Sequence, residues 1–468
     1  MHRKNFLVLI LVSLCIITGS PSCRKADKID SNASLVLSFS TDTVMFDTVL
    51  ATAGSITKRL LVYNHNSNKV VVSRIQLGGG DASMYRINVD GNPASSVHDI
   101  GIAGNDSLFV FVKVTVNPND NTTPFIVSDS IVFTTNGNRQ LVQLAACGQN
   151  ADFNISKTLK GNQVWDSLKA HVIYGFLRVD TGASLTILPG TKVYLHKKAY
   201  IAVSHEATLN INGQWEHPVR IQADRLDPYY RDFPGQWDGI YLERGSKNNS
   251  LSNTVIKNGN FGLLIDSLVA GSNPKLSMDG TIIQNMLYDG IYAYSTSVVS
   301  INCIIGNCGR AALRIEKGGS YDFRQLTVGN YWTASVRKLP SIVLSNYTYD
   351  SVGKKVPNDL VKAYFGNAIV YGSETDEIGL DSVAGTAFSY MFDHAILKTS
   401  LRTTNPGHYL ECLINKEPMF LDVFTCDYAI DSLSPAIGKG VPMGVINDIR
   451  GTLRPASPAL GAYEYFKR

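Results

Sequence analysis

The pattern of hydrophobic and polar positions changes near residue 150. From Leu35 to Cys147, short runs of alternating apolar and polar residues are separated by turns rich in Asn, Asp and Gly. Alternation with a period of two is typical of strands that bury one face. Strands at this spacing predict an antiparallel β-sandwich over residues 34–150. The region has one cysteine and no tryptophan, unlike antibody-type domains, so a spacer is its default role.

After residue 150 the apolar runs shorten and a motif repeats. Strand-like residues lead to an asparagine in TVIKN, TIIQN, CIIGN and LTVGN, which end at Asn258, Asn285, Asn307 and Asn330. The intervals are 27, 22 and 23 residues. A period near 22 without a helical pattern predicts a solenoid made of strands, and a leucine-rich repeat lacks its signature here. We therefore expect an all-β chain with a right-handed parallel β-helix over residues 151–468.

The repeated asparagines fit the sharp turns of such a coil. Asparagine tolerates the left-handed conformation, and stacked amides can hydrogen-bond from coil to coil. We interpret the four asparagines as a structural ladder. Gly262 and Gly290 would open the next strand of the coil. The inward positions that follow this register are Ile240, Leu242, Leu263, Ile265, Ile291, Ala293, Leu313 and Ile315.

The N-terminus carries an export signal. Arg3 and Lys4 precede an apolar run at residues 6–17, which is too short to span a membrane. Small residues then lead to Cys23, whose position resembles that of the acylated first residue of a lipoprotein. We expect a signal peptide over 1–22, a lipid-anchored tether over 23–33, and a location at the outer membrane or cell surface. An ordinary signal cleaved nearby is the alternative.

Charge and cysteine content narrow the function classes. The formal charge is +4, and removal of Arg3 and Lys4 leaves about +2, which gives no basic surface for nucleic acid. Beyond residue 23 there are five cysteines and no CxxC, which predicts neither a disulfide framework nor a metal site. Cys412 and Cys426 are a candidate pair, with free thiols as the alternative.

Several segments resemble a known family. LTILPGTKVYL, NGQWEHPVRIQAD, PGQWDGIYLE and NTVIKNGNFGLLI in succession are similar to exported right-handed parallel β-helix proteins of Bacteroidetes type, relatives of the pectate-lyase fold. DYAIDSLSPAIGKG, DIRGTLRP and LGAYEY resemble the closing segment of these helices, and in the first of them Gly438 replaces the customary Asp. The N-terminal domain resembles immunoglobulin-like domains of the Hydin and abnormal-spindle type. This fold hosts lyases, hydrolases, binding proteins and structural proteins.

The resemblance directs the search for chemistry to one outer face of the coil. Lyases on this fold use a Lys or Arg base with acidic calcium ligands, and hydrolases use paired carboxylates. The register projects Tyr241, Glu243 and Asp266 outward, and adjacent coils lie about 4.8 Å apart. Glu243 and Asp266 are therefore candidate catalytic residues, with a solvated outer face as the alternative. Ca²⁺ is expected only in a lyase, and no other cofactor is expected.

An aromatic loop at residues 224–239 interrupts the coil. Tyr229, Tyr230 and Trp237 stand there among charged residues, which suits a carbohydrate platform together with Tyr241. Alternatively, the aromatic rings cap the core and Trp237 is a buried residue of the coil.

The function that these observations favour is non-catalytic: an envelope lipoprotein that presents its β-helix to glycans or has a structural role. A polysaccharide lyase or glycoside hydrolase is the alternative. No GxSxG, phosphate-binding loop or HExxH motif is present.

Overall fold

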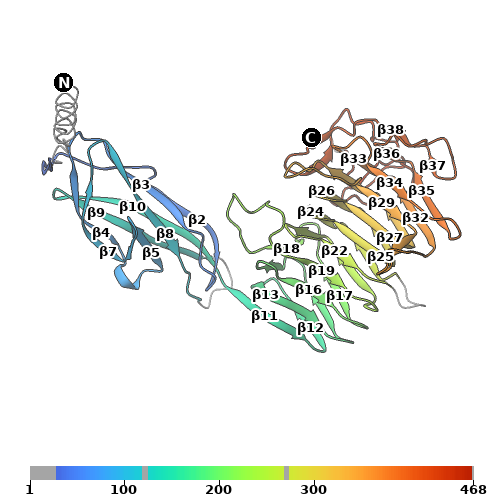
Figure 1. Cartoon of the computed structure of the whole chain (residues 1–468), viewed down its shortest axis with the longest axis horizontal. Helices are drawn as coiled ribbons and strands as arrows, with labels where there is room; N and C mark the ends of the chain where they lie inside the picture. The colour runs from blue at the N-terminus through green and yellow to red at the C-terminus, as the bar shows by residue number, and fades with distance from the viewer. Residues whose placement is uncertain (1–27, 119–124, 268–273, 466–468) are drawn as a thin grey trace, which may run out of the picture. The chain divides into compact units, whose positions relative to one another are not determined.

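The computed structural model describes residues 28–118, 125–267 and 274–465. The chain divides into two compact units, one built mainly of residues up to 146 and the other mainly of residues from 147 onward (Figure 1). The signal peptide and Cys23 lie outside the described residues. Within the described part, no helix is long and apolar enough to cross a membrane.

The first unit contains two five-stranded sheets whose described pairs are antiparallel. One sheet has the order β1 (Ser38–Phe39), β3 (Lys58–Asn64), β8 (Asp106–Val114), β5 (Tyr85–Val89) and β6 (Asn92–Ala94). The other has the order β2 (Thr43–Leu50), β10 (Asn138–Gln149), β9 (Phe125–Thr135), β4 (Val70–Leu77) and β7 (Ser96–Ile102). Antiparallel sheets followed by a parallel coil confirm the predicted fold class.

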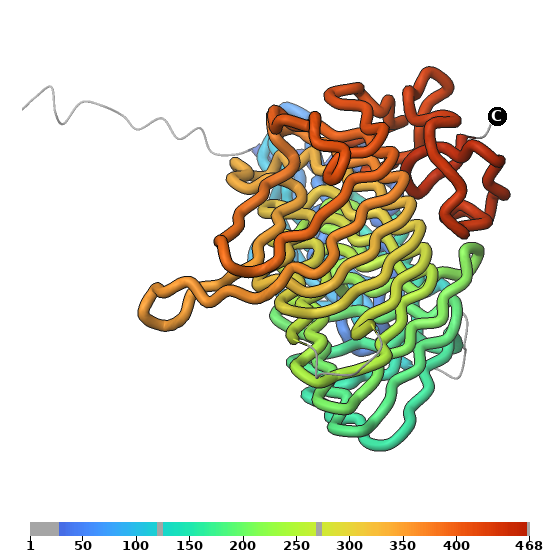
Figure 2. Tube along the Cα trace, turned by 90° about the vertical axis from the view of Figure 1, so that its right-hand side faces the viewer, coloured from blue at the N-terminus to red at the C-terminus, as the bar shows by residue number. Residues whose placement is uncertain are grey.

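The second unit is a parallel β-helix in which the chain passes repeatedly through three sheets (Figure 2). It opens with β11 (Ala151–Leu159), which pairs with β13 (Ala170–Val179). Sheet 1 contains β12 (Asn162–Trp165), β14 (Ser184–Ile187), β17 (Thr208–Asn212), β20 (Asn249–Ser252), β23 (Leu276–Asp279), the second halves of β25 (Ile291–Ile301) and β27 (Leu313–Arg324), β32 (Leu360–Gly366), β35 (Phe388–Asp393) and β37 (Tyr409–Leu410).

Sheet 2 contains the second half of β13 (Ala170–Val179), β16 (Tyr200–Val203), β19 (Gly239–Leu242), β22 (Leu263–Ile265), the first halves of β25 (Ile291–Ile301) and β27 (Leu313–Arg324), β29 (Ile342–Ser345) and β34 (Ile378–Asp381). Sheet 3 contains the first half of β13, β15 (Lys192–Leu195), β18 (Val219–Ala223), β21 (Thr254–Lys257), β24 (Ile282–Met286), β26 (Ile304–Cys308), β28 (Thr327–Asn330), β33 (Ile369–Gly372), β36 (Ile396–Leu397) and β38 (Leu413–Ile414). The hairpin of β30 (Tyr347–Tyr349) and β31 (Lys355–Pro357) projects from the coil, in orange in Figure 2.

The core follows the predicted register. Ile240, Leu263 and Ile291 are aligned in successive coils and are fully buried. Glycines open these strands because adjacent coils approach closely: a Cβ on Gly290 would lie 2.6 Å from the carbonyl oxygen of Ala312 in the next coil. A side chain at such a position would force two coils apart and break the hydrogen bonds between them.

The corner between sheet 3 and sheet 2 contains only part of the predicted ladder. Asn258, Asn285 and Asn307 have φ of 72°, 58° and 50°, and Asn307 Nδ2 donates to Asn285 Oδ1 at 2.7 Å. Asn258 Nδ2 instead donates to the carbonyl of Phe233. Asn330 ends strand β28 without the predicted positive φ, but its Oδ1 accepts the backbone N–H of Cys308 in the adjacent coil at 2.8 Å.

A second column of left-handed residues lies at the corner between sheet 1 and sheet 3. Each member directly precedes a strand of sheet 3 or stands two positions before it. The column consists of Asn253, Gly280, Asn302, Gln325, Asn367, His394 and Glu411. Its members differ in type, so no repeated letter marks it in the sequence. Positive φ at these turns lets the chain bend within one or two residues.

The C-terminal segment, residues 415–465, leaves the coil and covers the outer face of sheet 3. It contains β39 (Phe420–Asp422) and β40 (Asp427–Ile430). Tyr428 is buried over Gly306 and Gly329, and a side chain at either glycine would overlap its ring. Ile304 of sheet 3 belongs to the same hydrophobic cluster. Sheet 3 therefore has two hydrophobic interfaces: its inner face packs in the core of the coil, and its outer face packs against the C-terminal segment.

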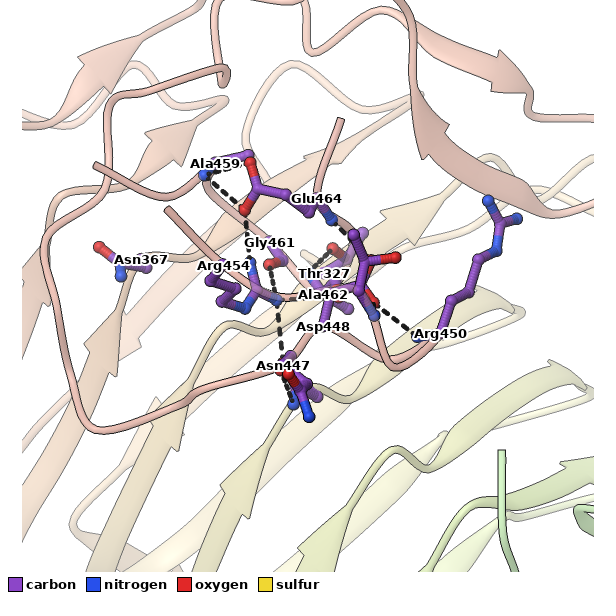
Figure 3. A network of polar contacts seen from close by, with 12 residues as sticks. Thr327, Asn367, Asn447, Asp448, Arg450, Arg454, Ala459, Gly461, Ala462 and Glu464 are labelled. Atoms are coloured by element: carbon purple, nitrogen blue, oxygen red, sulfur yellow. Dashed lines mark hydrogen bonds and ion pairs between the residues drawn. The ribbon is translucent and has the colours of Figure 1, made fainter. Parts of the chain in front are cut away.

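Arg454 fastens this segment to the coil (Figure 3). Its Nη2 donates to Asn302 Oδ1 at 2.9 Å and to the carbonyls of Gly461 and Ala462, and its Nη1 pairs with Glu464 at 3.3 Å. The carboxylate of Asp448 accepts the backbone N–H groups of Arg450, Thr452 and Glu464. The polar residues of the two closing motifs thus form one buried network.

We expect Arg454→Ala to lower the free energy of unfolding by about 3–5 kcal/mol, because it leaves the partly buried Glu464 without its partner. Arg450→Ala is the control: its side chain is 45% exposed and should cost about 1 kcal/mol or less. Urea denaturation measures both. Equal stabilities of the two variants would contradict the role assigned to Arg454.

Candidate functional site

A pocket of about 350 Å³ lies on the outer face of sheet 2. Strands β19, β22 and β25 form it. Its lining consists of Tyr241, Leu242, Glu243, Leu264, Ile265, Asp266, Tyr292 and Tyr294. The structure therefore brings together three residues singled out from the sequence, Tyr241, Glu243 and Asp266.

Register explains why the face is hollow. Tyr241, Leu264 and Tyr292 occupy the same outward position in three successive coils. The shorter Leu264 lies between two tyrosines and leaves a recess above it. The next outward position carries Glu243, Asp266 and Tyr294 in these coils. The pocket thus has an aliphatic floor, aromatic walls and an acidic rim.

The carboxylate of Glu243 is held by an arginine two coils away. Arg178 Nη1 lies 2.9 Å from both carboxylate oxygens and 3.0 Å from Ser204 Oγ. Both partners are about one-third exposed. Because the pairing occupies both oxygens, Glu243 is placed as a fixed hydrogen-bond acceptor and not as an unpaired acid.

The tyrosine hydroxyls are also engaged. Tyr241 donates to Asp238 Oδ2 at 2.8 Å, and Tyr292 donates to Glu316 Oε2 at 3.0 Å. Burial, and then the neighbouring carboxylates, raise the pKa of both phenols. The guanidinium of Arg314 lies 3.8 Å from the centre of the Tyr292 ring. The rings are therefore held in place as neutral groups.

Lys275 supports the rim from inside, and sequence reasoning missed it. Its side chain is fully buried, and its Nζ donates to the carbonyls of Glu243, Asp266 and Ser267 at 2.7, 2.6 and 3.2 Å. Burial lowers the pKa of Lys275 to about 8, against the opposing effect of Asp266 and Glu243. A single lysine before a strand carries no signal of this role in the sequence.

The aromatic loop at residues 224–238 lies outside the pocket. Tyr229 and Phe233 are 73% and 49% exposed, and Arg225 stacks on Tyr230. None of them lines the pocket. The prediction of a ligand contact is wrong for Trp237, because its indole is buried in the core and donates to the carbonyl of Lys257.

The described ranges contain no group of three or more His, Cys, Asp or Glu side chains that could hold a metal ion. The suggested pairing of Cys412 with Cys426 is absent, and both are free thiols. Cys426 Sγ lies 3.6 Å from Asn285 Oδ1, and Cys412 Sγ lies 3.4 Å from the carbonyl of Phe392. Burial raises the pKa of both thiols, that of Cys412 to about 11.

A family model described as a pectate-lyase-like β-helix domain matches residues 157–262. These residues include β19 and the start of the pocket. No curated protein matches the chain at a significant level. The second unit is therefore similar to pectate-lyase-like β-helix domains over its first coils.

Solved structures give only distant likenesses. A family 123 glycoside hydrolase from Clostridium perfringens, studied for glycolipid glycan hydrolysis, is 13% identical over 28% of this chain and 30% of its own, with a TM-score of 0.20. The PapD-like domain 7 of human CEP192 is 10% identical over 25% of this chain and 87% of its own, with a TM-score of 0.18. A family 87 α-1,3-glucanase domain bound to tetrasaccharides is 9% identical over 71% and 90%, with a TM-score of 0.12. At these scores the likenesses carry no argument about function.

The buried lysine gives a pH prediction. The unfolded chain keeps the Lys275 proton up to about pH 10.5, and the folded chain releases it near pH 8. The unfolded state therefore binds more protons in this interval, and stability from this group rises with pH. We expect the free energy of unfolding of the parent, relative to that of Lys275→Met, to rise by on the order of 2 kcal/mol from pH 7 to pH 10.

Urea denaturation at the two pH values measures this change. Lys247→Met is the control, because its side chain is 41% exposed and paired at the surface. If the free energies of unfolding of the parent and Lys275→Met differ by the same amount at both pH values, the lowered pKa assigned to Lys275 is contradicted.

Proposed function

We propose that the second unit binds a glycan in the pocket on sheet 2, and that the protein is a non-catalytic binding protein of the cell envelope. The observation that carries the proposal is the recess of Leu264 between the rings of Tyr241 and Tyr292, with Glu243 and Asp266 at its rim. Sugar rings have apolar faces and polar edges, so aromatic walls with fixed acceptors suit them.

The charged groups around the pocket favour binding over catalysis. A lyase needs an available base, but Arg178 is held by Glu243 and Arg314 is held by Asp289 and Glu316. Lys275 faces inward and donates to three carbonyls. Each of these three basic groups is already committed to a neighbour, and Lys317 lies over the ring of Tyr294, with its Nζ 5.3 Å from the ring centre. A general acid would need an uncommitted carboxyl. Glu243 is paired with Arg178, and Asp266 Oδ1 accepts the backbone N–H of Ser267.

Substitution of one aromatic wall tests the proposal. Tyr294→Ala should weaken glycan binding about tenfold or more, roughly 1.4 kcal/mol, because the ring lines the pocket. Affinity electrophoresis against a panel of neutral and acidic polysaccharides measures the effect. The double variant Tyr229→Ala/Tyr230→Ala is the matched control outside the pocket. Loss of binding in the double variant alone would move the site to the aromatic loop.

Glu243→Gln distinguishes the proposed binding protein from the alternative, a polysaccharide lyase or glycosidase. In a binding protein the amide keeps the shape of the side chain, so affinity should change little. In an enzyme that uses Glu243 for proton transfer, turnover should fall about a hundredfold or more. Reducing ends and unsaturated products released from the same polysaccharides measure turnover. A hundredfold loss would replace the binding proposal with the enzymatic one.

We also propose that the protein is exported and held in the envelope by a lipid on Cys23. The support is the basic, apolar and small-residue pattern of residues 1–23. Cys23→Ala should release the protein from the membrane fraction or leave it unprocessed. Fractionation and electrophoretic migration measure this, and if both stay the same as in the parent, the anchor is ruled out.

A further inference from the structure

A groove of about 540 Å³ lies at the corner between sheet 1 and sheet 3, away from the pocket on sheet 2. One wall comes from the turn between β17 and β18, and the other comes from the C-terminal segment. The lining consists of Gln214, Trp215, Glu216, Asn253, Asp279, Gly280, Ile301, Asn302, Asn447, Asp448, Ile449, Gly451 and residues 444–446. The groove and the sheet-2 pocket share no residue.

The wall that carries Trp215 is an enlarged corner. Later coils turn from sheet 1 to sheet 3 within one or two residues, but residues 213–218 separate β17 from β18. These extra residues place Trp215 at the surface, with 54% of its side chain exposed.

The opposite wall is fixed by the network of Arg454. Asn302 Nδ2 donates to the carbonyl of Asn447 at 2.9 Å, which holds the C-terminal segment on the corner. Gly451 lies close to the indole, and a Cβ there would be 3.5 Å from its ring. The opposite wall is therefore held on the coil by side-chain hydrogen bonds of Asn302.

The polar groups in the groove select its ligand by charge. Glu216 and Asp279 are acidic, and the carboxylate of Asp448 already accepts three backbone N–H groups. Among the residues that the structure describes, no Lys, Arg or His lines the groove. Amides of Gln214 and Asn253 supply both donors and acceptors. An acidic sugar would be repelled, whereas the hydroxyls of a neutral sugar can donate to the carboxylates.

We infer that this groove is a second glycan site, which takes a neutral pyranose unit stacked on Trp215 and rejects uronic acids. The volume lies within the range of sites for small molecules, and the pairing of one exposed ring with acceptor oxygens suits the apolar face and polar edge of a sugar. This inference does not depend on the pocket of sheet 2.

Tryptophan fluorescence tests the inference directly. The chain has four tryptophans, and Trp165, Trp237 and Trp332 are at most 6% exposed. Acrylamide quenching therefore reports mainly on Trp215. We expect a neutral hexasaccharide, from a set made of β-1,3-glucan, β-1,4-glucan, α-1,4-glucan and β-1,4-mannan, to protect the fluorescence from quenching. Hexagalacturonate should give no protection.

Matched variants complete the experiment. Trp215→Phe, with binding measured by calorimetry, should lower the affinity for the protecting hexasaccharide about threefold or more, and Trp215→Ala about tenfold or more. Tyr294→Ala changes only the sheet-2 pocket, so the hexasaccharide should still protect Trp215 from quenching in this variant. The two proposed sites can therefore fail independently of each other. Phe424→Ala controls for loss of an exposed ring, since Phe424 is 87% exposed outside the groove. Protection by none of the four neutral sugars, or protection by hexagalacturonate, would overturn the inference.

Discussion

The hydrogen bonds between parallel coils are the constraint on which the rest of this β-helix depends. They hold equivalent residues of adjacent coils about 4.8 Å apart, so every position is repeated in register above and below itself. One consequence is the column of glycine and alanine where coils meet, at Gly262, Gly290 and Ala312. Another is the outer column in which Leu264 falls between Tyr241 and Tyr292. Core, corners and pocket all follow from one repeated spacing.

The sequence revealed those features that depend on a repeated residue type. The inward stack from Ile240 to Ile315 could be predicted because apolar side chains recur at a period of two beside a glycine. The same register placed Tyr241, Glu243 and Asp266 on one outer face. The corner with Asn253, Gln325 and Glu411 escaped notice, because positive φ can be adopted by residues of different types. Backbone geometry repeats there while side-chain chemistry does not.

Long-range contacts could not be predicted for a different reason. Arg178 and Glu243 are separated by 65 residues, and the role of Lys275 depends on carbonyl groups, which every residue has. Trp215 and residues 444–451 meet only because the C-terminal segment turns back over the coil. Such pairs leave no local pattern. Trp237 is the reverse case, in which the local pattern misled. It lies in a polar loop sequence, which suggested an exposed ring, but it enters the core.

The C-terminal segment has a consequence for the order of folding. Its anchoring residues contact Asn302, Thr327 and Asn367, which belong to three successive coils. Docking therefore requires coils that already exist, whereas the coils can stack from the N-terminal end as the chain emerges. The segment that shields Ile304 and the glycines over which Tyr428 lies follows the coils in the chain, so it can dock only after them. A chain that lacks residues 415–465 would complete its coils and still expose an apolar, glycine-rich sheet face, which is a surface prone to aggregation.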